Sequence, residues 1–434
     1  MKAQKYIYLM LIVILINILV AFILMPPYFI IADEAHVFYR FYKYDIIQVI
    51  ESMKRDSHPP IHEIIAYIWL IFGGFDHPWS FRVLSVFLGL PALPLAFQIG
   101  RRLGGLRLGL SALTLLALNP WFLFLLILFR NYSLALTLGA WGVWIVLGLL
   151  DRPTPRRWAA WTLTQGLLLF THYYGALLIA ALWLTLLRRR PRGWPQGLLA
   201  STSAAALFAL WLHHALPGSI EANIGAFSVY SSVIRRLPWE VIINYIINTI
   251  TGPFVNQNFA HALSVVFILS LVSSIFRHLL VPISTFSKVS FRWSYLALWI
   301  VFPLITGALI ALRWPFFVAR SFAMLTVPWF VGLAAVLHLP RYRMWIPIIL
   351  TLGLIGLSRF PIMAAQPLGF SIPNLQKPYF EPNQPILAQA KWLMEHTSYT
   401  NLNEIEFVLD VSERFWLMSL NDRRGGKPTI LPSH

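Results

Sequence analysis

The sequence predicts an all-α protein that crosses a membrane many times. Apolar residues make up 58% of the 434-residue chain and charged residues only 12%, whereas about 25% of the residues in soluble domains are charged. A helix needs about 20 mostly apolar residues to cross the hydrocarbon core of a bilayer. We therefore expect about eleven transmembrane helices, at residues 5–25, 82–100, 107–129, 132–150, 157–171, 173–187, 194–216, 261–280, 293–312, 317–338 and 345–360.

The basic residues set the expected orientation of these helices. If the N-terminus is inside, the inner segments contain seventeen basic residues and a single acid, Asp151. Because cytoplasmic loops are enriched in Lys and Arg, we expect the N-terminus inside and the C-terminus outside. The net charge of +17 is then an orientation signal, and no nucleic-acid partner is predicted. The chain has no cysteine, which excludes disulfides, a thiol nucleophile and Cys-ligated metal.

Two of the predicted spans need an argument beyond hydropathy. The first has Lys2 and Lys5 at its start, as a signal peptide would, but its long apolar run ends in Met25-Pro26-Pro27 without a small-residue cleavage site. It is therefore expected to remain as an anchor. A single helix over 157–187 would place the basic cluster at 188–192 outside and invert every later loop. Two short helices meeting at Thr171-His172-Tyr173-Tyr174 keep the basic clusters inside, so we predict two.

The predicted transmembrane domain, 1–360, contains two large outer loops. The first, 26–81, includes Ile61–Gly74, which is too short to cross a bilayer and is expected to form an interfacial or re-entrant helix. The second, 217–260, contains turn signals at Pro217-Gly218, Pro238-Trp239 and Gly252-Pro253.

Beyond the last predicted span, residues 361–434 are expected to form a short extracytoplasmic tail. Pro361–Pro385 is rich in proline and polar residues, as a linker would be. Gln384–His396 has the pattern of a short helix and Glu406–Asp410 that of a short strand. A small α/β unit is therefore predicted outside the membrane.

Charged residues gather at the predicted outer ends of the helices, while the middles of the helices contain almost none. The adjacent acids Asp33-Glu34 lie shortly after the first span. Ionisable groups near a membrane are costly and so mark functional sites, although a solvated pair beside a helix end is an equally simple explanation. The other polar side chains of this outer end are Asp56, His58, His62, Glu63, Arg82, Arg130, His172, Arg313 and Arg320.

Some of these residues have a second interpretation. Asp56, His58, His62 and Glu63 have the spacing of metal ligands, but Ala66 stands where a zincin needs its second histidine. Two interpretations therefore stay open: a divalent metal ion bound at Asp56 and His58, or a simple extended turn at the His-Pro-Pro sequence. His172 also fits a hydrogen-bonded interface residue, and the arginines fit anchors that reach the lipid headgroups.

Taken together, the order of these motifs resembles that of the GT-C glycosyltransferases. The resemblance is to the branch that contains protein O-mannosyltransferases, the lipid A aminoarabinose transferase and the lipopolysaccharide-core galacturonosyltransferases (Rgt). The likeness covers about the first 340 residues and is most specific in Asp-Glu followed some two dozen residues later by His-Pro-Pro. The motifs that carry it are Asp33-Glu34, His58-Pro59-Pro60, Phe81-Arg82, Asn119-Pro120, Arg130-Asn131-Tyr132, Thr171-His172-Tyr173-Tyr174 and Arg320 ahead of Pro328.

The resemblance implies transfer of a sugar from a polyprenyl-phosphate donor to a lipid, glycan or protein acceptor at the outer face of the plasma membrane. Asp33 would be the base and Glu34 would orient the acceptor. Arg recognises phosphate oxygens with two parallel hydrogen bonds and is always charged. The expected phosphate ligands are Arg130, Arg320 and Arg82, with His58, Tyr132 and His172 as lesser contributors.

Two other functions remain as alternatives. A transporter or lipid flippase of envelope polysaccharide assembly has a similar number of spans. It would more often carry acids or histidines at mid-depth near broken helices, and the sequence shows neither these nor internal repeats. A structural subunit of such an assembly would leave the outer acids without a role.

Overall fold

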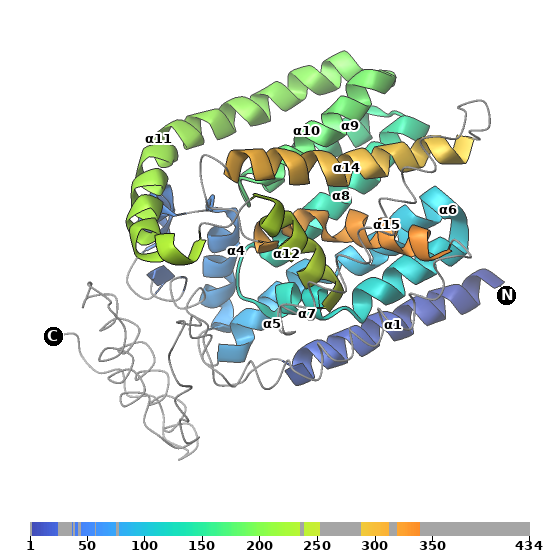
Figure 1. Ribbon diagram of the computed structural model, residues 1–434, viewed down its shortest axis with the longest axis horizontal. Coiled ribbons are helices and arrows are strands. Elements are labelled where there is room, and N and C mark those ends of the chain that lie inside the picture. The colour runs from blue at the N-terminus through green and yellow to red at the C-terminus, as the bar shows by residue number, and fades with distance from the viewer. Residues whose placement is uncertain are drawn as a thin grey trace.

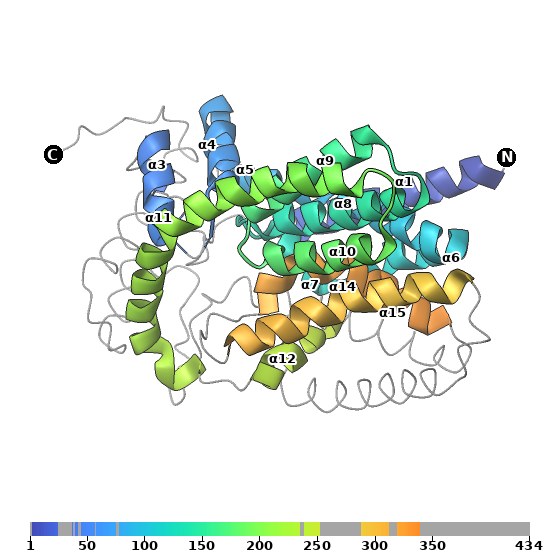
Figure 2. The ribbon, with the colours of Figure 1, turned by 90° about the horizontal axis from the view of Figure 1, so that it is seen from above.

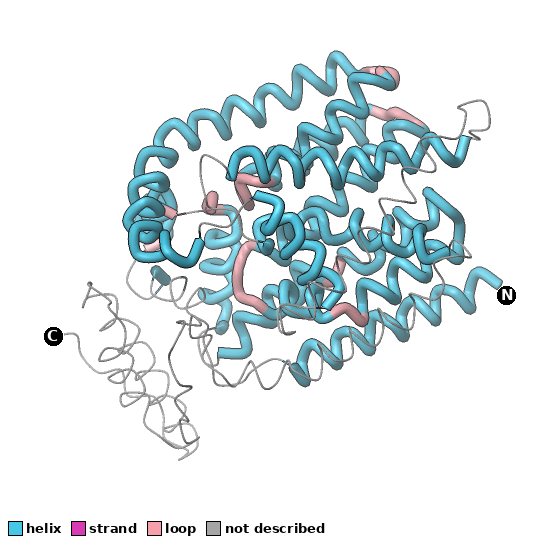
Figure 3. Tube along the Cα trace, in the orientation of Figure 1, coloured by secondary structure: helices cyan, strands magenta, loops and turns pink. Residues whose placement is uncertain are grey.

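The computed structural model is a bundle of helices (Figures 1 and 3). It describes residues 2–24, 37, 40–41, 45–56, 58–74, 78–234, 238–251, 288–311 and 319–338, and no strand occurs within these ranges. The elements are α1 (Lys2–Leu24), α3 (Ile46–Ser52), η1 (Met53–Arg55), α4 (Ile61–Trp69), η2 (Leu70–Gly74), α5 (Pro78–Gly89), α6 (Ala92–Ala117), α7 (Pro120–Ile127), α8 (Tyr132–Asp151), α9 (Pro155–Leu169), α10 (Gly175–Arg189), α11 (Trp194–Ile234), α12 (Pro238–Thr251), α14 (Lys288–Ala311), η4 (Ala319–Leu325) and α15 (Thr326–His338).

Four helical stretches of the described chain are long and apolar enough to cross a membrane: Ser80–Ala117, Tyr132–Asp151, Trp194–Gly218 and Ala319–Leu337. The first of them reverses direction inside α6. Gly104 and Gly105 leave the helical conformation, and Gly105 has φ +84°.

The two arms of α6 pack against each other through glycines. A Cβ added to Gly100 would lie 2.9 Å from the Cα of Gly109, although residues nine apart in a straight helix are about 13 Å apart. The arms are therefore antiparallel, as expected for separate spans at 82–100 and 107–129. The second span is not one continuous helix, however, because α6 ends at Ala117 and α7 begins at Pro120 after the extended Asn119.

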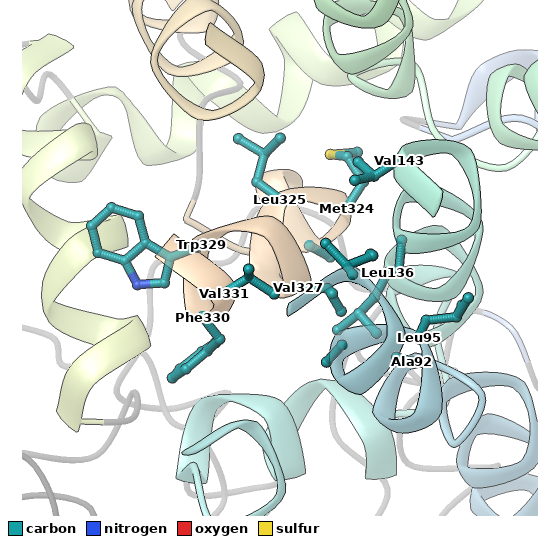
Figure 4. Close-up of a cluster of buried hydrophobic side chains, with 14 of the residues drawn as sticks. Ala92, Leu95, Leu136, Val143, Met324, Leu325, Val327, Trp329, Phe330 and Val331 are labelled. Carbon is teal, nitrogen blue, oxygen red and sulfur yellow. The ribbon is translucent and has the colours of Figure 1, made fainter. Parts of the chain in front are cut away.

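The helix α8 lies at the centre of the bundle. It packs against α6, α9, α10 and η4, and it is apolar around its whole circumference, which is typical of a buried helix. Figure 4 shows Leu136 and Val143 of α8 facing Met324 of η4 and neighbouring side chains of α6 and α15. A buried hydrogen bond also joins two neighbours of this core, since Trp299 Nε1 of α14 donates to Thr185 Oγ1 of α10 at 2.8 Å.

The segment 157–187 forms two helices, as predicted. α9 begins after Thr154, whose side chain accepts a hydrogen bond from the Arg157 amide. α9 and α10 are antiparallel neighbours, since Trp158 and Trp183 stack with ring centroids 6.0 Å apart. His172 lies in the loop that joins them.

The prediction that Pro217-Gly218 ends a helix is wrong. α11 continues through Pro217 to Ile234 and bends on the way (Figures 1 and 2), as a helix does where a proline removes one backbone hydrogen bond. Gly218 then fits closely against the first outer loop, because a Cβ there would lie 3.1 Å from the Lys54 carbonyl oxygen. The break predicted at Pro238 is confirmed as the start of α12.

The first outer loop contains the helix expected at 61–74, which the structure divides into α4 and η2. It also contains α3, which was not predicted; Asp45 and Gln48 form a capping box at its start. α3 and α4 lie at the end of the molecule opposite the start of α1 (Figures 1 and 2). The spans at 261–280 and 345–360 and the α/β tail at 361–434 lie outside the described residues, so the count of eleven and the orientation stay predictions.

Candidate functional site

Four segments of the chain meet at the end of the bundle where α4 begins. Ile61, the first residue of α4, donates its amide to the Phe170 carbonyl at 3.0 Å and so ties the first loop to the end of α9. Asn131, between α7 and α8, donates from Nδ2 to the Thr171 carbonyl at 2.7 Å. These bonds place His58, Arg130 and His172 in one buried group.

His58 is the centre of this group and is 7% exposed. Its Nδ1 lies 3.2 Å from Asp56 Oδ1 and 3.1 Å from Arg130 Nη2. The ring centroid of His58 is 5.1 Å from that of His172 and 5.9 Å from that of Tyr132. The sequence motifs that contain these residues are therefore parts of one site.

The last predicted member, Arg320, reaches the group from η4. Its guanidinium carbon lies 5.9 Å from the centre of the Tyr132 ring, within the range of a cation–π contact. Tyr132 is also 6.1 Å from His172, ring to ring. Arg130 and Arg320, 190 positions apart in the sequence, thus reach the same group of aromatic and imidazole rings.

A salt bridge with Arg40 anchors Asp56, the acidic member of the group. Arg40 Nη2 forms an ion pair with Asp56 Oδ2, and Arg40 Nη1 lies 2.9 Å from the sulfur of Met53. Burial by itself raises the pKa of Asp56, but Arg40, the hydrogen bond from His58 and the charge of Arg130 together hold that pKa well below its usual value. Asp56 is therefore ionised at neutral pH.

Both histidines are neutral at neutral pH. Burial lowers the pKa of His58, and Arg130 adds to this, although the bond to Asp56 acts in the opposite direction. Burial and the positive charge of Arg130 hold the pKa of His172 well below its usual value, and a proton added to His58 would lower that pKa further. The fixed positive charges at this end are thus arginines, and clustered guanidinium groups suit an anion with several oxygens.

A further buried pair lies in the first turn of α4. His62 and Glu63 are 0% and 1% exposed, with His62 Nδ1 3.6 Å from Glu63 Oε1. The His62 ring packs 5.5 Å from that of Phe129, next to Arg130. Burial raises the pKa of Glu63, but His62 and Arg130 lower it more, so that it ends below its usual value.

The structure places the residues that the sequence singled out as follows. His58, Arg130, Tyr132, His172 and Arg320 come together. Arg82 is buried in α5, where its neighbour Phe81 packs 5.4 Å, ring to ring, from Phe129. Asp33 and Glu34 lie outside the described residues, and their roles stay predictions.

Sequence reasoning missed Arg40 and the structural role of Asn131. Arg40 lies in a stretch with several other charged and aromatic residues, and no local motif marks its pairing with Asp56. Asn131 stands between two residues that were singled out, Arg130 and Tyr132. Its position inside the Arg-Asn-Tyr motif could have indicated that Asn131 also has a role in the site.

The metal ion that the sequence left open at Asp56 and His58 does not fit the geometry of these two residues. Both oxygens of Asp56 are already bonded, to Arg40 and to His58, and the facing nitrogen of His58 lies next to Arg130. A cation there would have to displace an arginine. Within the described part of the chain, no group of three or more metal-ligating side chains is spaced to hold an ion.

Comparisons with known proteins bear on the fold. The sequence matches no protein-family model and no curated protein. The structure is similar to the crystal structure of ArnT from Cupriavidus metallidurans bound to undecaprenyl phosphate, with a TM-score of 0.51, 13% identity, and coverage of 96% of this chain and 76% of that one. A likeness is also found to the oligosaccharyltransferase of Archaeoglobus fulgidus in its apo form, with a TM-score of 0.47, 16% identity, and coverage of 98% of this chain and 62% of that one.

The fold and the apolar helices define a polytopic membrane protein. The likeness to ArnT shows more particularly that the chain shares the fold of that protein, and ArnT-like enzymes belong to the branch that the order of the motifs resembles.

Proposed function

We propose that the protein is a glycosyltransferase that moves a sugar from a polyprenyl-phosphate-linked donor to an acceptor hydroxyl on the extracytoplasmic face of the plasma membrane. The observation that carries this proposal is that Arg130, which contacts His58, and Arg320, which lies over the Tyr132 ring, reach the same buried group of rings. The ArnT structure, whose fold the chain shares, was determined with undecaprenyl phosphate bound.

The arginines suit the chemistry of such a donor. When the bond between the sugar and the lipid phosphate breaks, the electron pair stays with the phosphate, whose negative charge grows. Cations that are already in place stabilise this change more than the ground state and so lower the barrier. We assign the phosphate to Arg130 and Arg320, with Arg82, His58, Tyr132 and His172 as supporting residues.

We assign the activation of the acceptor hydroxyl to the acidic pair, Asp33 and Glu34. Asp33 takes the proton of the acceptor hydroxyl as the oxygen attacks the anomeric carbon from the face opposite the phosphate. This single displacement inverts the anomeric configuration, and Glu34 orients the acceptor. The acceptor is a lipid, a glycan or a protein of the cell surface.

The test begins with a deletion strain. Mass spectrometry of its surface lipids, glycans and proteins is expected to show one missing sugar, which identifies donor and acceptor for an assay with the purified protein in nanodiscs. Arg130→Ala should abolish most transfer, whereas Arg107→Ala, which changes an exposed arginine at the reversal of α6, should leave transfer normal. Movement of a lipid-linked sugar across the bilayer without transfer would instead identify a flippase and overturn the proposal.

A further inference from the structure

Two chain reversals lie side by side at the end of α9 and α10 that is opposite to His172. One joins α8 to α9, and the other joins α10 to α11. Trp158, in the first turn of α9, donates from Nε1 to the Arg192 carbonyl, 34 positions away, at 3.0 Å. A Cβ added to Gly193 would lie 3.1 Å from the same nitrogen. The two reversals therefore form one continuous surface, on the side of the molecule where the chain begins (Figures 1 and 2).

This surface is strongly basic. Within residues 151–157 and 187–194 the sequence has a single acid, Asp151. We use the name arginine surface for the six exposed arginines of these two segments, which are Arg152, Arg156, Arg188, Arg189, Arg190 and Arg192. One carboxylate cannot neutralise six guanidinium groups, so the surface has a large net positive charge whatever Asp151 contacts.

The stability of the helices accounts for only part of this charge. Arg188 and Arg189 lie in the last turn of α10, where cations balance the helix dipole. Arg157, which is not part of the arginine surface, donates from Nη1 to the Gly148 carbonyl at 3.0 Å and so helps to end α8. Arg190 ends α10 in a left-handed conformation, and its guanidinium carbon lies 5.8 Å from the centre of the Trp194 ring. The other exposed arginines suit a partner outside the chain.

The helices become apolar directly beside the arginine surface. Leu184 and Leu187 of α10, just before Arg188, are exposed. Leu163 of α9 and Leu199 of α11 are 64% and 74% exposed. Exposed apolar side chains that form a patch mark a surface covered by a partner or a membrane. The arginines therefore lie where an apolar belt meets water, which is the level at which basic side chains reach phospholipid headgroups.

We propose that the arginine surface is a docking site for anionic phospholipid headgroups. The phosphate oxygens of such a lipid accept the parallel N–H donors of a guanidinium group, and its acyl chains cover the exposed leucines. A zwitterionic lipid has its own ammonium group beside the phosphate, so it gains less from a surface of net positive charge. A soluble anion gains no contact with the leucines. The proposal does not depend on sugar transfer, since it concerns the opposite end of the bundle.

The experiment measures the binding of dioleoylphosphatidylglycerol to the full-length protein in detergent by native mass spectrometry. Dioleoylphosphatidylcholine is the second probe. Because each basic residue near an anionic lipid surface contributes a factor of about 5, the wild type should bind phosphatidylglycerol at least about 10-fold more tightly than phosphatidylcholine. The difference should shrink as the ionic strength is raised, because salt screens exposed charges.

Three variants locate the site. A triple variant with Arg156→Gln, Arg188→Gln and Arg192→Gln should bind phosphatidylglycerol about 5-fold more weakly for each arginine removed. The same three positions changed to Lys keep their charge and should retain most of the affinity. Arg55→Gln removes an exposed arginine from the first outer loop, at the other end of the bundle, and should leave the affinity unchanged. If the triple Gln variant does not fold, the three single Gln variants take its place, each with a loss of about 5-fold.

Several results would overturn the docking site. Equal affinity of the wild type for the two lipids would do so, and so would wild-type affinity for phosphatidylglycerol in the folded Gln variants. A loss in the triple Lys variant as large as that in the triple Gln variant would show that the charge is not what binds the lipid. Displacement of phosphatidylglycerol by an equal concentration of glycerol 1-phosphate would identify a site for a soluble anion instead.

Discussion

Gly139 of α8 lies directly against Met324 of η4. A Cβ at position 139 would come within 2.5 Å of the Met324 carbonyl oxygen and 2.8 Å of its Cβ. The obstacle is backbone, which cannot rotate away as a flexible side chain can. Because η4 contains Arg320 and α8 begins at Tyr132, this contact sets the distance between two members of the candidate site.

Gly139→Ala is therefore expected to push η4 and Arg320 away from Tyr132. Overpacking of this kind costs about 1–3 kcal/mol, so the melting temperature should fall and the donor KM should rise. The matched control is Gly166→Ala in α9, where the new Cβ would meet only the Ala204 Cβ at an ordinary 3.8 Å. A Gly139→Ala protein with normal KM would show that the position of η4 is not critical for the donor.

A second prediction concerns Arg320 itself. Arg320→Ala should raise the donor KM by about 10- to 100-fold, since a hydrogen bond between charged groups contributes about 1.5–3 kcal/mol. Lys should restore only part of the affinity, because a point charge replaces the planar fork. The measurement is turnover at limiting donor. Normal turnover in Arg320→Ala would make this arginine a headgroup anchor only.

Much of the fold followed from the sequence because its signals are local. The two helices at 157–187 followed from charge alone, since the basic cluster after Leu187 had to return to the inner side. The reversal of α6 could be predicted because it lies between two apolar runs, at 82–100 and 107–129, that are each long enough to be a separate span. The continuation of α11 through Pro217 could not be predicted in the same way, because no local signal indicates that the chain at Gly218 lies close to Lys54 of the first outer loop.

The site shows the same division between local and distant signals. His58, Arg130, Tyr132 and His172 stand in short motifs that are visible in the sequence, so their meeting could be anticipated from a family resemblance. Arg40 could not, since its role arises only where the folded chain brings it to Asp56, 16 residues away.

A third prediction tests the orientation of the chain. Reporters fused after Arg190, where α10 ends in a residue with φ 46°, and after Arg343 should read cytoplasmic. A reporter fused after Lys377 should read external. These results would place the basic clusters inside, as expected from charge. An external reading after Arg190 would invert the assignment and move His172 to the inner face.

A fourth prediction concerns acid stability. The pKa of Asp56 is lower in the folded protein than in the unfolded chain, so its ionised form stabilises the fold at pH values above about 4. This stabilisation is lost as the pH falls toward the folded-state pKa. Between about pH 5 and pH 3, the melting temperature of the wild type in detergent should fall more steeply than that of Asp56→Asn. Parallel curves for the two proteins would contradict the ion pair with Arg40.

The last prediction concerns Asp33, the proposed base. Asn has nearly the same size as Asp and still forms hydrogen bonds, so Asp33→Asn should leave folding and undecaprenyl phosphate binding largely intact. Asn cannot take the proton of the acceptor hydroxyl, however, and a positioned general base contributes about 10²- to 10⁴-fold. Transfer by the purified protein in nanodiscs should fall by about that factor through kcat.

Glu34→Gln provides the comparison for Asp33→Asn. Its loss should be smaller and should appear mainly in the acceptor KM, because we assign Glu34 to orientation and not to proton transfer. Folded Asp33→Asn protein that turned over like the wild type would leave the acidic pair as solvated groups beside a helix end. The proton of the acceptor hydroxyl would then need a base other than Asp33, beside the phosphate site that we propose at Arg130 and Arg320.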